Sequence, residues 1–260
     1  MLRILKETAH RPWLLPSRPW IMAQSWHDLL FAHWPVKTET LRPLIPAALK
    51  IDNFDGTGWI GIVPFSMTGV RLRGTPPLPW LSAFPELNVR TYVTAENKPG
   101  VWFFSLDAAN ALAVAAARIT FHLPYFRARM GCEENGDWIH YRSERVHRGA
   151  PQAALIAKYK PVGDTFAAKS GTLEHFLTER YCLYAADSQG GIFRGDIHHP
   201  EWKLQRAEAE FSRNSMAEAA GVTLPTLEPL LHFARRQDMV AWAPQQIVRG
   251  SPAVKNEENP

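Results

Sequence analysis

The chain has 260 residues, a formal net charge of +4 at neutral pH and a hydrophobic fraction of 46%. This length is enough to bury a substantial core in one domain, and ten Trp with 21 Pro favour many short elements over a helical bundle. The arginines are scattered, whereas binding to nucleic acid by counterion release requires a concentrated basic stripe. We therefore expect no nucleic-acid partner.

The cysteines and the apolar segments indicate the compartment. Cys132 and Cys182 stand outside any C-x-x-C pattern, and nothing indicates a disulfide framework. The basic N-terminus lacks the apolar core of a signal peptide, and no apolar run approaches the ~20 residues of a membrane helix. We expect a cytoplasmic protein without membrane association.

The first eighty residues are predicted to form an extension followed by short strands. Residues 1–20 are the extension, and one domain is expected over 21–250, with a disordered polar tail at 251–260. A short helix is expected over 38–44, capped by Thr38 or Thr40. Strands are predicted over 26–36, 49–54 and 59–70, the second followed by a turn at Asp55-Gly56.

The segment 84–129 is the most informative part of the chain. It is predicted to hold a strand, a turn, an aromatic strand over 101–106, a short helix and a third strand. Because side chains alternate along a strand, one face of the first strand is polar and the other apolar. The polar face carries Glu86, Asn88, Arg90 and Tyr92. An aromatic neighbour predicted to be buried on both faces favours a polar cavity over solvent.

The second half of the chain continues the pattern of short strands. A hairpin is predicted from 127–130 and 138–145, and Thr172 is expected to cap a helix. Segment 203–219 fits a strand or a helix equally well. Further strands are expected at 154–159, 181–184 and 194–197, with a closing hairpin from 230–234 and 239–243.

Many short strands with few helices predict an α+β, mostly β protein. Its sheet is expected to be antiparallel and closed or nearly closed, because closure removes unpaired strand edges. The chain also resembles the YqjF-like family of uncharacterised bacterial proteins, a branch of the acetoacetate decarboxylase-like superfamily. The resemblance implies a cone-like closed antiparallel β-barrel with an internal cavity and a few short flanking helices. The matching blocks are WHDLLFAHWPV (26–36), LRPLIP (41–46), FDGTGWIGIVPF (54–65), FPELNVRTYV (84–93), PGVWFFSLDA (99–108), AARITFHLPY (116–125), GTLEHFLTERYCLY (171–184) and HHPEW (198–202).

The resemblance also indicates which chemistry to look for. In acetoacetate decarboxylase-like enzymes a lysine of lowered pKa forms a Schiff base with the substrate carbonyl. Here Tyr125 and Phe126 follow Pro124, where that lysine would stand. Lys158 and Lys160 share a strand face and are alternative amines, although paired lysines at an exposed edge are common.

The candidate binding residues are polar side chains of the central segment. Glu86 corresponds to an acidic pocket residue of the superfamily, and Arg90 has the planar donor geometry of a carboxylate clamp. In a purely structural alternative, Glu86 pairs with Arg118 or Arg127. The full set of predicted binding residues is Glu86, Asn88, Arg90, Ser105, Arg118 and Tyr125.

The histidines and the glycines provide no cofactor signature. Adjacent His198 and His199 have poor chelating geometry, and no zinc spacing appears, so no metal is expected. No dinucleotide, P-loop or flavin motif is present, and no cofactor is predicted.

Two functions remain open from the sequence. The protein binds or transforms a small anionic metabolite that bears a carboxyl or oxo group, without the lysine. Alternatively, it is a non-catalytic binding, sensing or structural protein. The sequence leaves open whether it is an enzyme and whether it forms a homo-oligomer.

Overall fold

The computed structural model describes residues 3–78, 82–110, 114, 118 and 120–250. The tail predicted at 251–260 and most of the helix predicted between the second and third central strands lie outside these residues. The strands are β1 Met22–Val36, β2 Lys50–Ile51, β3 Gly58–Leu72, β4 Phe84–Ala95, β5 Lys98–Ala108, β6 Tyr125–Asn135, β7 Trp138–Arg145, β8 Ala154–Phe166, β9 Cys182–Ala186, β10 Ile192–His198, β11 Leu204–Asn214, β12 Leu230–Ala241 and β13 Gln245–Val248. The short helices are α1 Thr38–Leu41 and α3 Leu173–Thr178, with 3-10 turns at Ile4–Lys6, Arg42–Leu44 and Glu218–Ala220.

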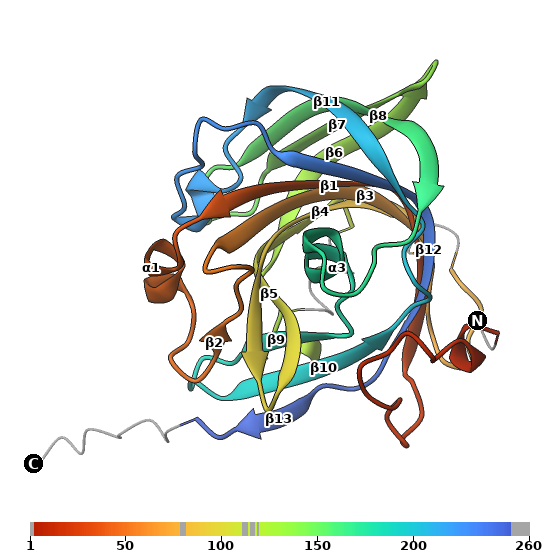
Figure 1. The fold of residues 1–260 in the computed structure, drawn as a ribbon, viewed down its shortest axis with the longest axis vertical. Helices are drawn as coiled ribbons and strands as arrows, with labels where there is room; N and C mark the ends of the chain where they lie inside the picture. The colour runs from red at the N-terminus through yellow and green to blue at the C-terminus, as the bar shows by residue number, and fades with distance from the viewer. Residues whose placement is uncertain (1–2, 79–81, 111–113, 115–117, 119, 251–260) are drawn as a thin grey trace, which may run out of the picture.

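The described strands form one large ring-like sheet. Its order is β13-β10-β9-β5-β6-β7-β8-β11-β12-β1-β3-β4-β2, and β4 also pairs with β5. β10 also pairs with β12. Strands that are far apart in this order are therefore paired at two places, β4 with β5 and β10 with β12. Figure 1 shows the resulting ring, with α3 inside its outline. The protein is mostly β with short helices, as expected.

The sheet is not wholly antiparallel, and this corrects one expectation. β5 pairs in parallel with β6 through Leu106 and Tyr125, and in parallel with β9 through Val101 and Leu183. Parallel neighbours require a crossover connection rather than a tight turn. The parallel pairing places Tyr125 beside the end of β5.

Both faces of β4 are buried, but against different partners. Leu87, Val89 and Val93 join a large apolar cluster with residues of β1, β3, β7, β8 and β12. On the opposite face, Tyr92 packs with α3 and β5 in a separate cluster. The predicted alternation along β4 is therefore confirmed, and the polar face points away from solvent.

Three strand predictions were wrong or incomplete. The closing hairpin is one continuous strand, β12, which pairs with β1 from Met22↔Ala241 to His33↔Leu230. Its polar centre resembles a turn in sequence, yet Arg235 forms ion pairs with Asp28 and Glu134 instead. The undecided segment 203–219 contains strand β11, and the strand expected at 49–54 is limited to β2 and an isolated Phe54↔Thr57 bridge.

The helix caps follow the prediction at one helix and not at the other. Thr172 is the N-cap of α3, and its hydroxyl accepts a hydrogen bond from the His175 amide. At α1 the N-cap is Lys37 and no side chain caps the helix, so neither Thr38 nor Thr40 has the expected role. The α3 cap bears on the candidate site described below, because α3 contacts the polar face of β4.

The N-terminal segment packs against the sheet. Ile4 lies in a small apolar cluster with Ala23, Val240 and Trp242. Further along, the Arg11 guanidinium donates to the Ile197 carbonyl at 2.9 Å and contacts His198 Nδ1 at 3.1 Å. Residues of the predicted extension are thus integrated with β1, β10 and β12.

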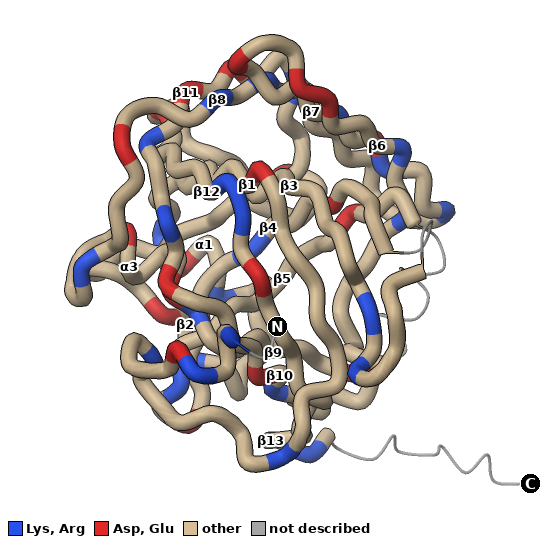
Figure 2. The backbone as a smooth tube through the Cα atoms, turned by 90° about the vertical axis from the view of Figure 1, so that its right-hand side faces the viewer, with Lys and Arg blue, Asp and Glu red and all other residues tan. Residues whose placement is uncertain are grey.

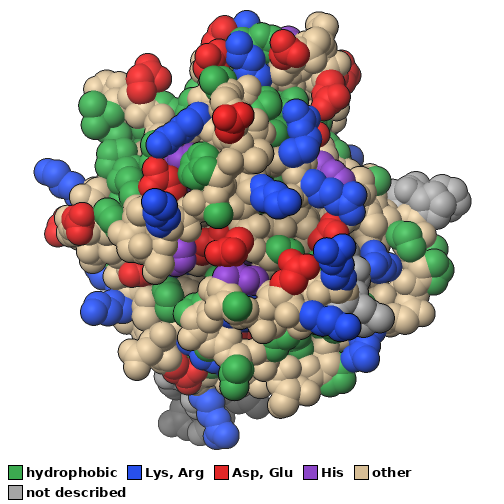
Figure 3. Space-filling view, turned by 45° about the vertical axis from the view of Figure 1, so that its right-hand side comes forward, with side chains coloured by type: hydrophobic (Ala, Val, Ile, Leu, Met, Phe, Trp, Pro, Cys, Tyr) green, Lys and Arg blue, Asp and Glu red, His purple; other side chains and the backbone are tan. Residues whose placement is uncertain are grey.

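Charged residues of both signs are spread over the molecule. Figure 2 shows acidic and basic residues interspersed along the backbone, and the face in Figure 3 carries both kinds side by side. Within the described part of the chain, no helix has the length and apolar character needed to cross a bilayer.

Candidate functional site

The polar row of β4 forms the centre of the candidate site. Glu86 and Asn88 are 3% and 5% exposed, and Arg90 is half-buried. A buried carboxyl and a buried amide are costly unless they have partners. The Asn88 Oδ1 atom has none among the described residues.

Glu86 is held by two tyrosines. The Tyr125 hydroxyl donates a hydrogen bond to Glu86 Oε2 at 2.9 Å, and the Tyr141 hydroxyl donates to the Glu86 backbone carbonyl at 2.7 Å. Burial raises the pKa of Glu86 to about 8, against the opposing effect of the Tyr125 hydrogen bond. Near neutral pH this carboxyl therefore keeps its proton, and it can both donate and accept hydrogen bonds.

A buried ion pair lies behind this carboxyl. Arg145 of β7 contacts both carboxylate oxygens of Asp107 with its Nε, at 3.2 and 3.0 Å, and a terminal nitrogen approaches Asp107 Oδ1 at 2.6 Å. Burial raises the pKa of Asp107, and Arg145 opposes that rise. The negative charge of Asp107 also contributes to the raised pKa of Glu86.

Arg90 differs from Arg145 because it has no acidic partner among the described residues. One terminal nitrogen donates to the Leu177 carbonyl of α3 at 3.2 Å, the guanidinium also hydrogen-bonds to the Tyr92 side chain, and the buried Nε has no acceptor among the described residues. Its guanidinium lies 5.2 Å from the Phe31 ring centroid and 5.8 Å from the Tyr92 ring centroid. This environment leaves a positive charge on an interior face with hydrogen-bonding capacity unused.

Two predicted site residues lie elsewhere. Ser105 pairs with Val89, so it lies on the opposite face of the sheet from Asn88 and its neighbours. Arg118 is exposed, and it donates to the Tyr125 backbone carbonyl at 2.6 Å. Of the six predicted binding residues, Glu86, Asn88, Arg90 and Tyr125 share the polar face. Glu86 bonds to Tyr125 rather than to Arg118 or Arg127.

The sequence interpretation missed two histidines on the same face. His33 of β1 and His232 of β12 are fully buried, and each has an Nδ1 atom with no partner within the described structure. The pKa of His33 is well below its ordinary range and that of His232 is lowered to about 4, mainly through burial. His33 stands within a predicted strand, but no local motif distinguishes it from a packing residue.

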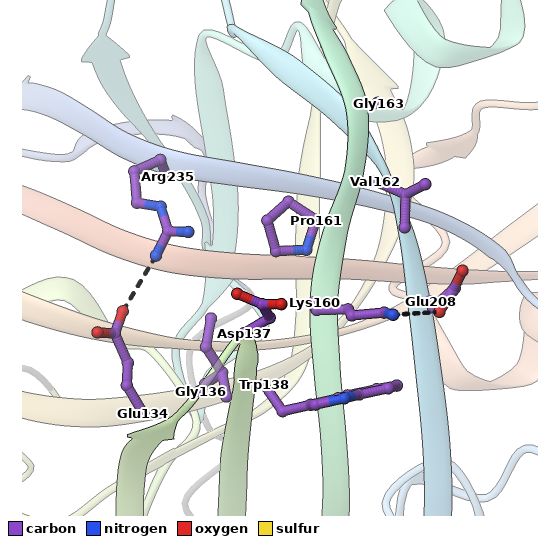
Figure 4. A pocket seen from close by; sticks show the side chains of 11 residues that line it. Glu134, Gly136, Asp137, Trp138, Lys160, Pro161, Val162, Gly163, Glu208 and Arg235 are labelled. Atoms are coloured by element: carbon purple, nitrogen blue, oxygen red, sulfur yellow. Dashed lines mark hydrogen bonds and ion pairs between the residues drawn. The ribbon is translucent and has the colours of Figure 1, made fainter.

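Two pockets lie apart from the polar row. The one in Figure 4 has a volume of about 500 Å³, and four of its charged side chains form ion pairs, Arg235 with Glu134 and Lys160 with Glu208. The second, of about 550 Å³, is lined by Trp102, Phe103 and Phe104 together with Arg118 and His122. Neither is lined by Glu86, Asn88 or Arg90.

The alternative lysines have structural partners. Lys158 pairs with Glu210 at 3.0 Å, Lys160 pairs with Glu208 at 2.9 Å, and both ammonium groups lie over the Trp138 ring. Because β8 pairs with both β7 and β11, the two lysines do not lie at the exposed sheet edge that the structural alternative expected, and their partners Glu208 and Glu210 are on the neighbouring strand β11. Among the residues described, no three His, Cys, Asp or Glu side chains are grouped to hold a metal ion.

Solved structures identify the fold to which this geometry belongs. The enduracididine biosynthesis enzyme MppR superposes with a TM-score of 0.63 at 9% identity, over 91% of each chain. Acetoacetate decarboxylase from Legionella pneumophila gives a TM-score of 0.61 at 11% identity, over 94% of this chain and 95% of that one. An acetoacetate decarboxylase-like enzyme from Sphingomonas wittichii RW1 gives 0.58 at 11% identity, over 91% and 98%. The protein therefore has an acetoacetate decarboxylase-like fold.

The family is shown by sequence. Residues 23–238 match the model of the DUF2071 family, described as an uncharacterized conserved protein. The chain is also 49% identical over 228 residues to the uncharacterized protein YqjF of Bacillus subtilis (strain 168), covering 88% of this chain and 93% of that protein. The chain belongs to this YqjF-like family.

Proposed function

We propose that the ring-like sheet is a closed, cone-like β-barrel whose interior polar face binds a small carboxylate. The observation that carries the proposal is Arg90, a guanidinium on the polar face with no acidic partner and with an Nε that has no acceptor among the described residues. An arginine fork binds a carboxylate through two parallel hydrogen bonds. A bound carboxylate would supply the acceptors and the negative charge that this face lacks.

Glu86 and Tyr125 give the site a second chemical capacity. Glu86 is protonated near neutral pH, so it can donate a proton or a hydrogen bond to an oxygen of the ligand. Tyr125 keeps its phenolic proton, because burial and Glu86 hold its pKa well above the ordinary range. Asn88 lies between Glu86 and Arg90 on the same strand face and has an unused amide oxygen.

The proposal involves no Schiff base, because none of the described residues assigned to this site is a lysine. Tyr125 stands where the superfamily lysine is expected, and the two alternative lysines are engaged with Glu208 and Glu210. MppR, which shares this fold, has been solved in complex with pyruvate. Binding of a similar oxo- or hydroxycarboxylate by this chain would use Arg90 for the carboxylate.

The test is a ligand-induced shift in melting temperature with acetate, propionate, lactate and pyruvate. We expect stabilisation of the wild type and none of Arg90→Ala, because the desolvated contact contributes about 2–5 kcal/mol. Arg90→Lys keeps the charge without the fork and should retain part of the shift. If no carboxylate stabilises the wild type while Arg90→Ala loses several kcal/mol without ligand, Arg90 is structural and the proposal fails.

A further inference from the structure

Two histidines near Arg90, His33 and His232, each have a buried ring nitrogen whose role as hydrogen-bond donor or acceptor can be assigned. In the β1–β12 pairing, His33 is opposite Leu230 and His232 is opposite Phe31. Residues directly opposite each other point to the same side of a sheet, so the two imidazoles are diagonal neighbours on one face. The ring of Phe31 stacks on that of His33, with 6.2 Å between centroids.

His33 lies next to Arg90 across β3. The residue between them in the sheet is Gly61, which pairs with both. A Cβ atom at Gly61 would lie 2.9 Å from His33 Nε2 and 3.4 Å from Arg90 Cγ. The absence of a side chain at this position therefore allows the imidazole and the arginine to approach each other.

The hydrogen bonds of Tyr92 fix the tautomer of His33. The Tyr92 hydroxyl is 2.7 Å from the Leu177 carbonyl oxygen, which can only accept, so the single hydroxyl proton lies between them. His33 Nε2 is also 2.7 Å from that hydroxyl and must donate to it. Because His33 is neutral, its Nδ1 has no proton and presents a buried lone pair without a donor among the described residues.

Arg206 fixes the opposite tautomer at His232. An arginine nitrogen can only donate, and Arg206 lies 3.3 Å from His232 Nε2, so this ring nitrogen accepts. The neutral ring therefore carries its proton on Nδ1, a buried donor for which the described part of the chain supplies no acceptor.

Both tautomers depend on α3. Leu177 supplies the carbonyl that orients Tyr92, and Glu174 forms an ion pair with Arg206 at 3.4 Å. Arg180, just beyond α3, contacts Asp52 at 2.6 Å and helps to hold the helix in place. The six-residue helix thus orients one histidine as an acceptor and the other as a donor.

We infer that His33 and His232 together bind a hydroxyl group, which donates to His33 Nδ1 and accepts from His232 Nδ1–H, and that the ligand is a small hydroxycarboxylate. The inference rests on the proposed function for its carboxylate, which Arg90 would hold. A hydroxyl satisfies both ring atoms, whereas an oxo group can only accept and leaves His33 Nδ1 unpaired. A site built around a hydroxyl discriminates strongly against analogues that lack it.

The first test compares binding of lactate, pyruvate and propionate by NMR titration of the full chain. We expect lactate to bind at least about tenfold more tightly than either analogue, which corresponds to one hydrogen bond. Equal binding of the three overturns the inference while leaving the carboxylate site in place.

A neutral pair separates this inference from the proposed function. Lactamide and propionamide have no carboxylate, so a preference for lactamide reports on the histidines alone. A preference for lactamide without carboxylate binding rejects the proposed function and keeps the hydroxyl site. Equal binding of the two amides overturns the hydroxyl site and assigns the two ring atoms to a buried water.

Two substitutions of His33 provide a matched control. In His33→Gln the amide nitrogen can still donate to Tyr92, but the Nδ1 acceptor is lost, so the lactate preference should disappear. In His33→Asn the amide oxygen can replace Nδ1, and the preference should persist. Long-range ¹H–¹⁵N spectra should show the Nε2–H form of His33 and the Nδ1–H form of His232, and the reverse assignment overturns the inference irrespective of ligand.

Discussion

The Tyr125 hydroxyl donates a 2.9 Å hydrogen bond to Glu86 Oε2, and this bond joins the start of β6 to the polar row of β4. The contact exists because β6 pairs in parallel with the end of β5, which places Tyr125 on the same face as Glu86. It provides the candidate site with a phenol next to a carboxyl of raised pKa.

Glu86→Gln should become more stable relative to the wild type as the pH rises. The pKa of Glu86 is raised from 4.5 to about 8, so between these values the folded protein holds a proton that the unfolded chain has released. The folded state of the wild type therefore loses stability as pH rises through this window, and the penalty is complete above about pH 8.

Glutamine removes that dependence, and urea unfolding at pH 6 and pH 9 measures it. The difference in unfolding free energy between variant and wild type should grow by about 2–3 kcal/mol between these two pH values. Glu144→Gln, at an exposed position of β7, is the control and should show no such trend. A parallel pH profile for wild type and Glu86→Gln would contradict the raised pKa.

Tyr125→Phe should raise the pKa of Glu86 further. The lost hydroxyl is the group that stabilises the ionised carboxylate, so its removal favours the protonated form. A ¹³C titration of the glutamate carboxyl carbons measures the shift, and the variant should lose about 1 kcal/mol of stability. Tyr159→Phe, whose hydroxyl binds the Asp28 carbonyl, should leave the titration unchanged. A lower Glu86 pKa in Tyr125→Phe would show that the bond has been misassigned.

Arg145→Met should destabilise the protein by about 3–5 kcal/mol, because it leaves the buried Asp107 carboxylate unpaired. The double variant Asp107→Leu/Arg145→Met should recover most of that loss in chemical denaturation. Arg129→Met is the control, since its pair with Glu144 is exposed and contributes less than about 1 kcal/mol. A similar loss for Arg129→Met and Arg145→Met would show that burial does not determine the value of this pair.

Incubation with pyruvate and cyanoborohydride should leave the mass of the protein unchanged. A Schiff base requires a neutral, accessible amine, and Lys158 and Lys160 are bound as ammonium groups to Glu210 and Glu208. Intact-mass spectrometry detects a reduced adduct directly. An adduct mapped to either lysine would restore the decarboxylase or aldolase interpretation.

Local sequence was sufficient for features that depend on backbone geometry alone. The alternation of Glu86, Asn88 and Arg90 against Leu87 and Val89 follows from the period of two in a strand. The Thr172 cap follows from the preference of a hydroxyl for the first free amides of a helix. Both were predictable because the interacting groups are a few residues apart.

The continuity of β12 and the placement of Ser105 could not be predicted in this way. Arg235 interrupts an apolar pattern and so resembles a turn residue, until Asp28 and Glu134 from other strands provide its partners. The β4–β5 pairing has a register irregularity next to Ser105, between Val89 and Arg90. Which side chains meet there depends on long-range pairing and not on local propensity.

The sequence by itself determined the mostly β class, the polar row on β4 and the absence of a lysine after Pro124. Only the tertiary structure showed that Tyr125 hydrogen-bonds to Glu86 and that Arg145 forms an ion pair with Asp107. It also showed that His33 and His232 lie on the same face as Arg90. The physical reason is that a side chain's face is fixed by its own strand, while its partners, burial and pKa are fixed by strands far away in the chain. Asn88 and Arg90 illustrate the division, since their shared face was visible in the sequence and their unpartnered atoms were not.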